Sequence, residues 1–190
     1  KIKQEKRGKI DIMSPISIHL LENRHFDELF EFEIQNRAFF ENMGFGRANN
    51  YYDKKQFELI QEEIIQEQAQ GKHFMYLVKD KIGVIVGRVN LIDVVRSNLN
   101  KAEIGYRMGA AYQSKGYGTK AVSLAIEQAK KVHELERLEA GTSPYNIGSQ
   151  IVLIKNGFQF KDRKKQSIYH NGRWEDSILF EKVLDEMLIK

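Results

Sequence analysis

The stretch YQSKGYGTKAV, residues 112–122, places two glycines and a lysine directly ahead of an amphipathic segment. Gly116 and Gly118 have no Cβ, so backbone N–H groups there can approach a ligand closely, and Lys115 adds a positive charge. The first turn of a following helix contributes unpaired N–H groups and the positive end of the helix dipole. These features are typical of an anion site and favour phosphate as the ligand. Glycines also end strands and start turns for purely structural reasons, so that simpler interpretation stays open.

The spacing of these residues does not match the two common nucleotide motifs. A P-loop requires G-x-x-x-x-G-K-[ST], whereas Thr119 and Lys120 follow Gly118 here without that spacing. The dinucleotide fingerprint requires a third glycine, and alanine or valine stands in its place. We therefore expect a phosphate-bearing ligand of another kind.

Composition is that of one soluble globular domain, with 190 residues, 42% hydrophobic and 29% charged. The chain has no cysteine, which excludes disulfides, thiolate zinc sites and a cysteine nucleophile. The five histidines show neither H-x-x-x-H nor carboxylate spacing, so no metal is expected. No apolar run approaches the roughly 20 residues of a membrane span. We expect a cytoplasmic protein that does not contact membrane.

The positive charge is concentrated at the start of the chain. Residues 1–12 carry a net charge of +3 out of the total of +4. We expect residues 1–12 to form a flexible basic extension and residues 13–190 to form a single domain. A basic tail of this kind does not predict direct binding of nucleic acid.

Hydrophobic periodicity predicts a layered α/β fold. Strands are expected at residues 16–21, 73–79, 84–95, 102–108, 137–142, 158–170 and 173–183, the last two joined by an Asn171-Gly172 turn. Helices are expected at 25–40, at 54–70 with Asp53 as its cap, after Gly116, and at 149–156 with Gly157 as its stop. The first helix has its apolar residues at Phe26, Leu29, Phe30, Ile34 and Ala38. The third has them at Ala121, Val122, Ala125, Ala129 and Val132. This order predicts a mixed sheet.

In this context, Gln113-Ser114-Lys115-Gly116-Tyr117-Gly118 resembles the [QR]-x-x-G-x-[GA] motif with which the GNAT superfamily of N-acetyltransferases binds acetyl-coenzyme A (acetyl-CoA). Asn146-Ile147-Gly148-Ser149, followed by Asn156-Gly157-Phe158, is similar to that family's N-x-x-S and GF segment. The resemblance covers residues from about 14 to 184. It implies a mostly antiparallel mixed sheet flanked by helices.

Within the superfamily, the sequence AEIGY at residues 102–106 is most similar to the ribosomal-protein serine/alanine N-acetyltransferases. Ala110 stands where proline is common in the family, and Ser114 stands where glycine is common. Neither departure removes a backbone donor, so binding of acetyl-CoA is still expected.

The resemblance implies where acetyl-CoA binds. Its pyrophosphate is expected on backbone N–H groups of Gln113, Ser114, Lys115, Gly116, Tyr117, Gly118 and Thr119. The pantetheine amides are expected to pair with the backbone of Met108, as in β-strand addition. The side chain of Asn146 can both donate to and accept from such amides. Asn146 is also a common type of turn residue after a proline such as Pro144.

Acetyl transfer requires a neutral amine. An α-amino group has a pKa near 7.7 to 8.0 and a lysine near 10.4, so a modest base is enough for a protein N-terminus. The AEIGY likeness implies that Glu103 is this base, acting directly or through water. Alternatively, Glu103 has only a structural role, as a solvated strand residue in a salt bridge. Glu139 and Glu175 are less favoured candidates for the base.

The departing thiolate must be protonated. Many relatives use a tyrosine four residues before the GF pair, but Leu153 stands there. The resemblance to the serine-bearing branch of the family implies that Ser149 acts instead. A small residue chosen for close packing of its helix is the other interpretation of Ser149.

These observations together predict an acetyl-CoA-dependent N-acetyltransferase that works by direct transfer, since no cysteine is present to form an acyl-enzyme. The predicted acceptor is the N-terminal α-amine of a protein such as a ribosomal protein. A polyamine or antibiotic amine stays open as the acceptor, and so does a non-catalytic coenzyme A (CoA) sensor of the same fold. The oligomeric state, a homodimer included, is not determined by the pattern.

Overall fold

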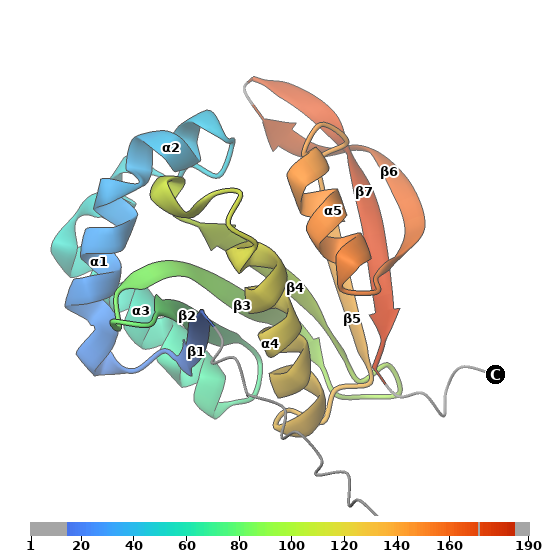
Figure 1. Cartoon of the computed structure of the whole chain (residues 1–190), viewed down its shortest axis with the longest axis horizontal. Helices are drawn as coiled ribbons and strands as arrows, with labels where there is room; N and C mark the ends of the chain where they lie inside the picture. Colours follow the sequence, from blue (N-terminus) through green and yellow to red (C-terminus); the bar gives the residue numbers. More distant parts are fainter. Residues whose placement is uncertain (1–14, 171, 185–190) are drawn as a thin grey trace, which may run out of the picture.

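The computed structural model describes residues 15–170 and 172–184 of the chain (Figure 1). Its strands are β1 (Ile16–Leu20), β2 (Phe74–Asp80), β3 (Ile85–Val95), β4 (Lys101–Met108), β5 (Arg137–Thr142), β6 (Gln159–His170) and β7 (Arg173–Val183). Its α-helices are α1 (Phe26–Gln35), α2 (Arg37–Asn42), α3 (Lys54–Ala69), α4 (Tyr117–Lys131) and α5 (Ile147–Lys155). Short 3-10 helices are η1 (Asn23–His25), η2 (Asn49–Tyr52) and η3 (Ala110–Tyr112).

The seven strands form one sheet in the order β1-β2-β3-β4-β5-β7-β6. Every neighbouring pair is antiparallel except β4 and β5, which are parallel. This arrangement confirms the expected mixed, mostly antiparallel sheet flanked by helices. The predicted extension at residues 1–12 and residue Asn171 of the predicted turn lie outside the described residues. The hairpin itself is present, because β6 and β7 pair from Gln159 with Glu181 to His170 with Arg173.

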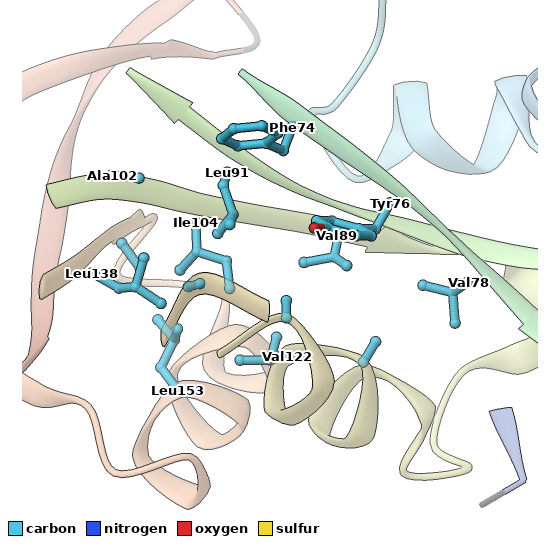
Figure 2. Packing of buried hydrophobic residues seen from close by; sticks show 14 of the residues in the cluster. Phe74, Tyr76, Val78, Val89, Leu91, Ala102, Ile104, Val122, Leu138 and Leu153 are labelled. Atoms are coloured by element: carbon cyan, nitrogen blue, oxygen red, sulfur yellow. The ribbon is translucent and has the colours of Figure 1, made fainter. Parts of the chain in front are cut away.

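A hydrophobic core fills each side of the sheet. On one face, Val89, Leu91 and Ile104 pack toward Val122 of α4, as Figure 2 shows. On the other face, Met75 and Leu77 belong to a second cluster with residues of α1 and α3. Side chains alternate between these two cores along each strand, because successive residues of a strand point to opposite faces.

Helix α4 lies close to the sheet because its inner face is small. Ala121, Val122, Ala125 and Ala129 are each fully buried, as the spacing predicts. The prediction for Val132 is wrong, because this residue caps the end of α4 and is 60% exposed. The tight packing of α4 places its first turn at the end of β4.

The helix predicted at residues 25–40 is interrupted at Asn36. This residue leaves the helical conformation, with φ −100° and ψ 3°, and separates α1 from α2. Its side-chain Nδ2 donates to the Phe32 carbonyl at 2.9 Å, and its Oδ1 accepts from the Ala110 N–H at 2.8 Å. The side chain competes for the helix's own backbone groups and joins the break to the loop after β4. Ile34 belongs to the apolar spacing of the predicted helix but is 43% exposed, whereas Glu33 is fully buried.

Candidate active site

A cleft forms where β4 and β5 separate. The two strands pair only from Lys101 with Arg137 to Glu103 with Glu139, after which β4 stays with β3 and β5 stays with β7. A bulge in β3 between Ile92 and Val95 lies at the level of this last shared pair, and bulges increase local twist. Figure 1 shows the two halves of the sheet diverging, with α2 over one half and α5 over the other. The resulting cleft has a volume of about 1110 Å³.

The predicted phosphate loop forms one end of this cleft. Gly116 caps α4 in the left-handed region at φ 75°, and a Cβ built there would meet no atom within 4 Å. The first bond of the helix runs from the Lys120 N–H to the Gly116 carbonyl at 3.1 Å. The N–H groups of Tyr117, Gly118 and Thr119 precede that bond, so they have no carbonyl one turn behind them. The loop therefore presents unpaired donors beside open space, as a bound phosphate requires.

Gly118 is needed for close packing. A Cβ at this position would lie 3.3 Å from Tyr106 Cε2 and 3.7 Å from Met108 Cγ. The side chain of Asn156 donates to the Thr119 carbonyl at 3.1 Å and so joins α5 to the first turn of α4. The absence of a side chain at Gly118 lets the loop lie close to β4, and the Asn156 hydrogen bond joins it to α5.

The edge of β4 presents backbone groups to the cleft. The Gly109 N–H donates to the Val86 carbonyl at 2.9 Å. Because alternate residues of an antiparallel strand bond to the same neighbour, Arg107 and Gly105 also bond to β3. Met108 and Tyr106 alternate with those positions, and their N–H and C=O groups point away from β3, where β5 has departed. The Met108 carbonyl already accepts from Gln113 Nε2 at 2.8 Å. One lone pair of that carbonyl, together with the Met108 N–H, is left to pair with an extended amide ligand.

Asn146 and Ser149 lie together at the start of α5. Asn146 Oδ1 accepts from the Ser149 N–H at 3.1 Å and caps the helix, which leaves its Nδ2 amide to donate into the cleft. Ser149 and Tyr106 both line the cleft, and the Ser149 side chain lies close enough to the Tyr106 hydroxyl to influence its pKa. Burial raises the pKa of Tyr106, and the interaction with Ser149 opposes that shift. Sequence reasoning gave Tyr106 no role, although it is the last residue of the AEIGY segment.

The carboxylates differ in how they meet the cleft. Glu103 is exposed and lies at the edge of the cleft. Its cross-strand neighbour Ile92 and Gly105, two residues further along β4, both line the cleft. Desolvation raises the pKa of Glu103, and repulsion from Asp93 and Glu139 adds to that shift, so the carboxylate is more basic than usual. Glu175 lines the cleft directly and is buried.

The other two candidate carboxylates form ion pairs. The Glu175 carboxylate lies 3.3 Å from Arg173 Nε and accepts from Ser143 Oγ at 3.4 Å. Glu139 binds Lys101 and Lys161, and its pKa is lowered: desolvation raises it, but the hydrogen bonds to both lysines outweigh that effect. These contacts favour a structural role for Glu139.

Four arginines that sequence reasoning did not single out also line the cleft: Arg47, Arg88, Arg107 and Arg173, the last of which forms the ion pair with Glu175. A charged residue inside an otherwise apolar strand such as VIVGRVNL is the signal that would have identified Arg88. Lys115, by contrast, places its Nζ over the Tyr112 ring at 5.3 Å and does not line the cleft.

Comparison with known proteins defines the class. Residues 16–159 match the family described as acetyltransferase (GNAT) domain, so the chain belongs to this family. The probable N-acetyltransferase YjcK of Bacillus subtilis is 34% identical over 166 residues, which are 85% of this chain and 90% of that protein. The ribosomal-protein-serine acetyltransferase of Escherichia coli is 25% identical over 93% of this chain and 97% of its own length.

A solved structure shares the fold. The ribosomal-protein-S5-alanine acetyltransferase of Vibrio fischeri superimposes with a TM-score of 0.84 at 24% identity, covering 91% of this chain and 95% of that chain. The protein is thus a GNAT-type N-acetyltransferase that uses acetyl-CoA. The open cradle at Gly116 and the free edge of β4 fit that ligand. Residues 15–170 and 172–184 contain no group of three or more His, Asp or Glu side chains that could hold a metal, and no helix among them could span a membrane.

Proposed function

We propose that this enzyme acetylates the N-terminal α-amine of a protein, a ribosomal protein being the best-supported example, by direct transfer within a ternary complex. One observation carries the proposal: a single cleft brings together the phosphate loop, a hydroxyl at Ser149 and the carboxylate of Glu175, and Glu103 lies at its edge, opposite the lining residue Ile92. The similar proteins of E. coli and V. fischeri, named for ribosomal serine and alanine acetylation, support the acceptor. Such an acceptor would place the activity in the cytoplasm.

Bound acetyl-CoA supplies the thioester. In the proposal, the N–H groups from Ser114 to Thr119 bind its pyrophosphate, since the Gln113 N–H donates to the Ala110 carbonyl at 3.4 Å. The Met108 backbone and Asn146 Nδ2 bind the pantetheine amides. Ser149 donates the proton that the departing thiolate requires, and Tyr106 orients the Ser149 hydroxyl. No cysteine is available for an acyl-enzyme, so the amine itself attacks the thioester carbon.

The proton of the attacking amine is removed by Glu103 acting through water. Its edge position supports a water-mediated path, and its raised pKa supports its basicity. Glu175, which lies inside the cleft, is the competing carboxylate. An α-amine needs only a modest base at neutral pH, because its pKa is near 8, whereas a lysine acceptor would need a far stronger one.

The test is a CoA-release screen with acetyl-CoA and a panel of amines. Peptides with free Ser or Ala N-termini are compared with the same peptides blocked at the N-terminus, spermidine, an aminoglycoside and lysine. We expect release with the free peptides and none with the blocked ones. Turnover restricted to spermidine or the aminoglycoside would reject the proposed acceptor and leave the acetyltransferase assignment intact.

A further inference from the structure

The wall of the cleft formed by β3 and β4, on the face that α1 and α3 cover, carries an excess of positive charge. We call this wall the acceptor side. Glu33 is fully buried and lies 3.0 Å from Arg88 Nε and 3.4 Å from Arg107 Nη1, so one carboxylate is shared by two guanidinium groups. Arg47 lines the same wall and lies over the Tyr51 ring at 5.6 Å. Among residues 15–170 and 172–184, no carboxylate lies within ion-pair distance of Arg47. Arg88 and Arg107 thus share one carboxylate, and the exposed Arg47 adds a third positive charge to the same wall.

Burial makes this excess charge costly. Arg88 is 4% exposed and the Arg107 side chain is 11% exposed. Desolvation, followed by repulsion from Arg88, lowers the pKa of Arg107 to about 10. Buried charges are normally paired, so a cluster in a cleft that is left with surplus positive charge is suited to an anion that arrives with a ligand.

The cluster lies on the opposite face of the sheet from the phosphate loop. Arg88 pairs with Arg107 across β3 and β4, and both side chains point to the face that α1 and α3 cover. Gly116 begins α4, which packs on the other face. The arginines are therefore not an extension of the cradle that would hold the pyrophosphate.

The positions between the arginines and Glu103 are suited to an amine. Asn90 and Gly105 are cross-strand neighbours on the same face of the sheet as the arginines. Gly105 lies two residues from Arg107 and two residues from Glu103, a distance of about 7 Å along the strand in each direction. A Cβ at Gly105 would meet nothing within 4 Å, so the space above it is open. The Asn90 Oδ1 atom is buried and has no hydrogen-bond donor within the described part of the chain. This unpaired oxygen could accept a hydrogen bond from the N–H of an amine.

We propose that the acceptor of this enzyme carries a carboxylate close to its reactive amine, with the amine over Gly105 beside Asn90 and the carboxylate at Arg107 and Arg47. This inference rests on the proposed function and narrows its substrate class. A peptide with Asp or Glu directly after its first residue has this chemistry, and so does a free amino acid. A polyamine, which carries only positive charge, is repelled.

The experiment measures kcat/KM for three peptides that differ only at the second residue, Ser-Asp, Ser-Asn and Ser-Lys, with free glutamate and spermidine as further arms. We expect the Asp peptide to exceed the Asn peptide by about tenfold or more, and the Lys peptide to be poorest. Glutamate as the best arm would identify a free amino acid as the source of the carboxylate and would support the inference. Equal rates for all three peptides would overturn the inference while leaving N-terminal acetylation in place. Turnover of spermidine alone would overturn both.

Variants separate the cluster from general charge effects. Arg107→Gln should reduce the Asp-to-Asn preference to about twofold or less, and calorimetry should show unchanged affinity for CoA. Arg24→Gln removes an equal charge from an exposed ion pair with Glu22 and should keep the preference. Arg47 stands on an exposed loop, so Arg47→Gln keeps the test valid if the Arg107 variant fails to fold. A loss of CoA affinity with the preference retained would assign the cluster to the cofactor and overturn the inference.

Discussion

At the scale of single residues, the hydroxyl pair of Ser149 and Tyr106 is the feature most specific to the chemistry. The two side chains come from α5 and β4, the elements that form opposite walls of the cleft. In the proposed mechanism, Tyr106 holds the Ser149 hydroxyl in place to protonate the thiolate. Its effect should therefore be on turnover and not on binding.

Ser149→Ala should lower kcat by about 100-fold or more with little change in affinity for acetyl-CoA, because the proton is needed only as the thiolate forms. Tyr106→Phe keeps the serine but removes its partner, so a smaller loss in kcat is expected. Steady-state kinetics with calorimetry measures both effects. Equal turnover of wild type and Ser149→Ala would return Ser149 to a packing role.

The two carboxylates can be distinguished by pH. Glu103→Gln should lose most kcat/KM near pH 7 and recover as the pH rises past about 8, because the neutral α-amine is then supplied by solution. Glu175→Gln should show a similar loss at every pH, since Glu175 binds Arg173 and Ser143 and shapes the cleft. The measurement is a pH profile for both variants with an N-terminal peptide. The reverse pattern would make Glu175 the base.

At the scale of elements, the order of strands and helices could be predicted from the sequence, because periodicity and caps are local signals. Asp53 does cap α3, accepting from the Gln56 N–H at 3.0 Å. The break at Asn36 could not be predicted, because its Oδ1 binds Ala110, which is distant in sequence. The separation of β4 from β5 likewise depends on a bulge and on pairing between distant strands.

The first turn of α4 can be tested with a matched pair of glycines. Gly116 and Gly83 both have positive φ, 75° and 89°, and neither would have an atom within 4 Å of an added Cβ. Valine at either position should cost about 1 to 2 kcal/mol of stability through backbone strain. Only Gly116→Val should weaken acetyl-CoA binding, by about tenfold or more, because only that side chain would enter the phosphate space. Equal affinities by calorimetry would mean that the loop does not bind the phosphates.

At the scale of the whole molecule, the arginine cluster depends entirely on topology. Glu33, Arg88 and Arg107 come from α1, β3 and β4, and only the folded sheet brings them together. The candidate residues at Gly116 and Ser149 could be named from sequence because they lie in short motifs. The acceptor side could not, because its residues share no local pattern.

The fold also buries a histidine that should make stability depend on pH. The His133 ring stacks on the Phe74 ring, with the two ring centroids 3.6 Å apart. Its Nε2 atom forms a hydrogen bond of 2.5 Å with the Tyr76 hydroxyl. Burial, with a contribution from Arg96, lowers the pKa of His133 from 6.5 to about 4. The folded protein therefore keeps this ring neutral, while the unfolded chain protonates it below pH 6.5. Stability should be complete above pH 6.5 and fall by about 3 kcal/mol toward pH 4.

Urea unfolding between pH 7.5 and 4 measures this dependence. His133→Gln should be less stable at pH 7 but should show a shallower slope between pH 6.5 and 4. Some slope should remain, because the pKa values of His25 and His73 are lowered as well, chiefly by burial. Replacing the exposed His19 is the control and should leave the slope unchanged. An unchanged slope in His133→Gln would mean that this ring titrates normally.

The central claim is that the cleft between β4 and β5 transfers acetyl from acetyl-CoA to an N-terminal α-amine. The most direct measurement is fragment mass spectrometry of a peptide with a free Ser N-terminus, an acidic second residue and one internal lysine, after incubation with enzyme and acetyl-CoA. We predict that the acetyl group is on the first residue with wild type and that, at acetyl-CoA concentrations below saturation, Gly116→Val places it there at least several-fold more slowly. Acetyl on the internal lysine alone, or equal N-terminal acetylation by both proteins, would contradict the claim.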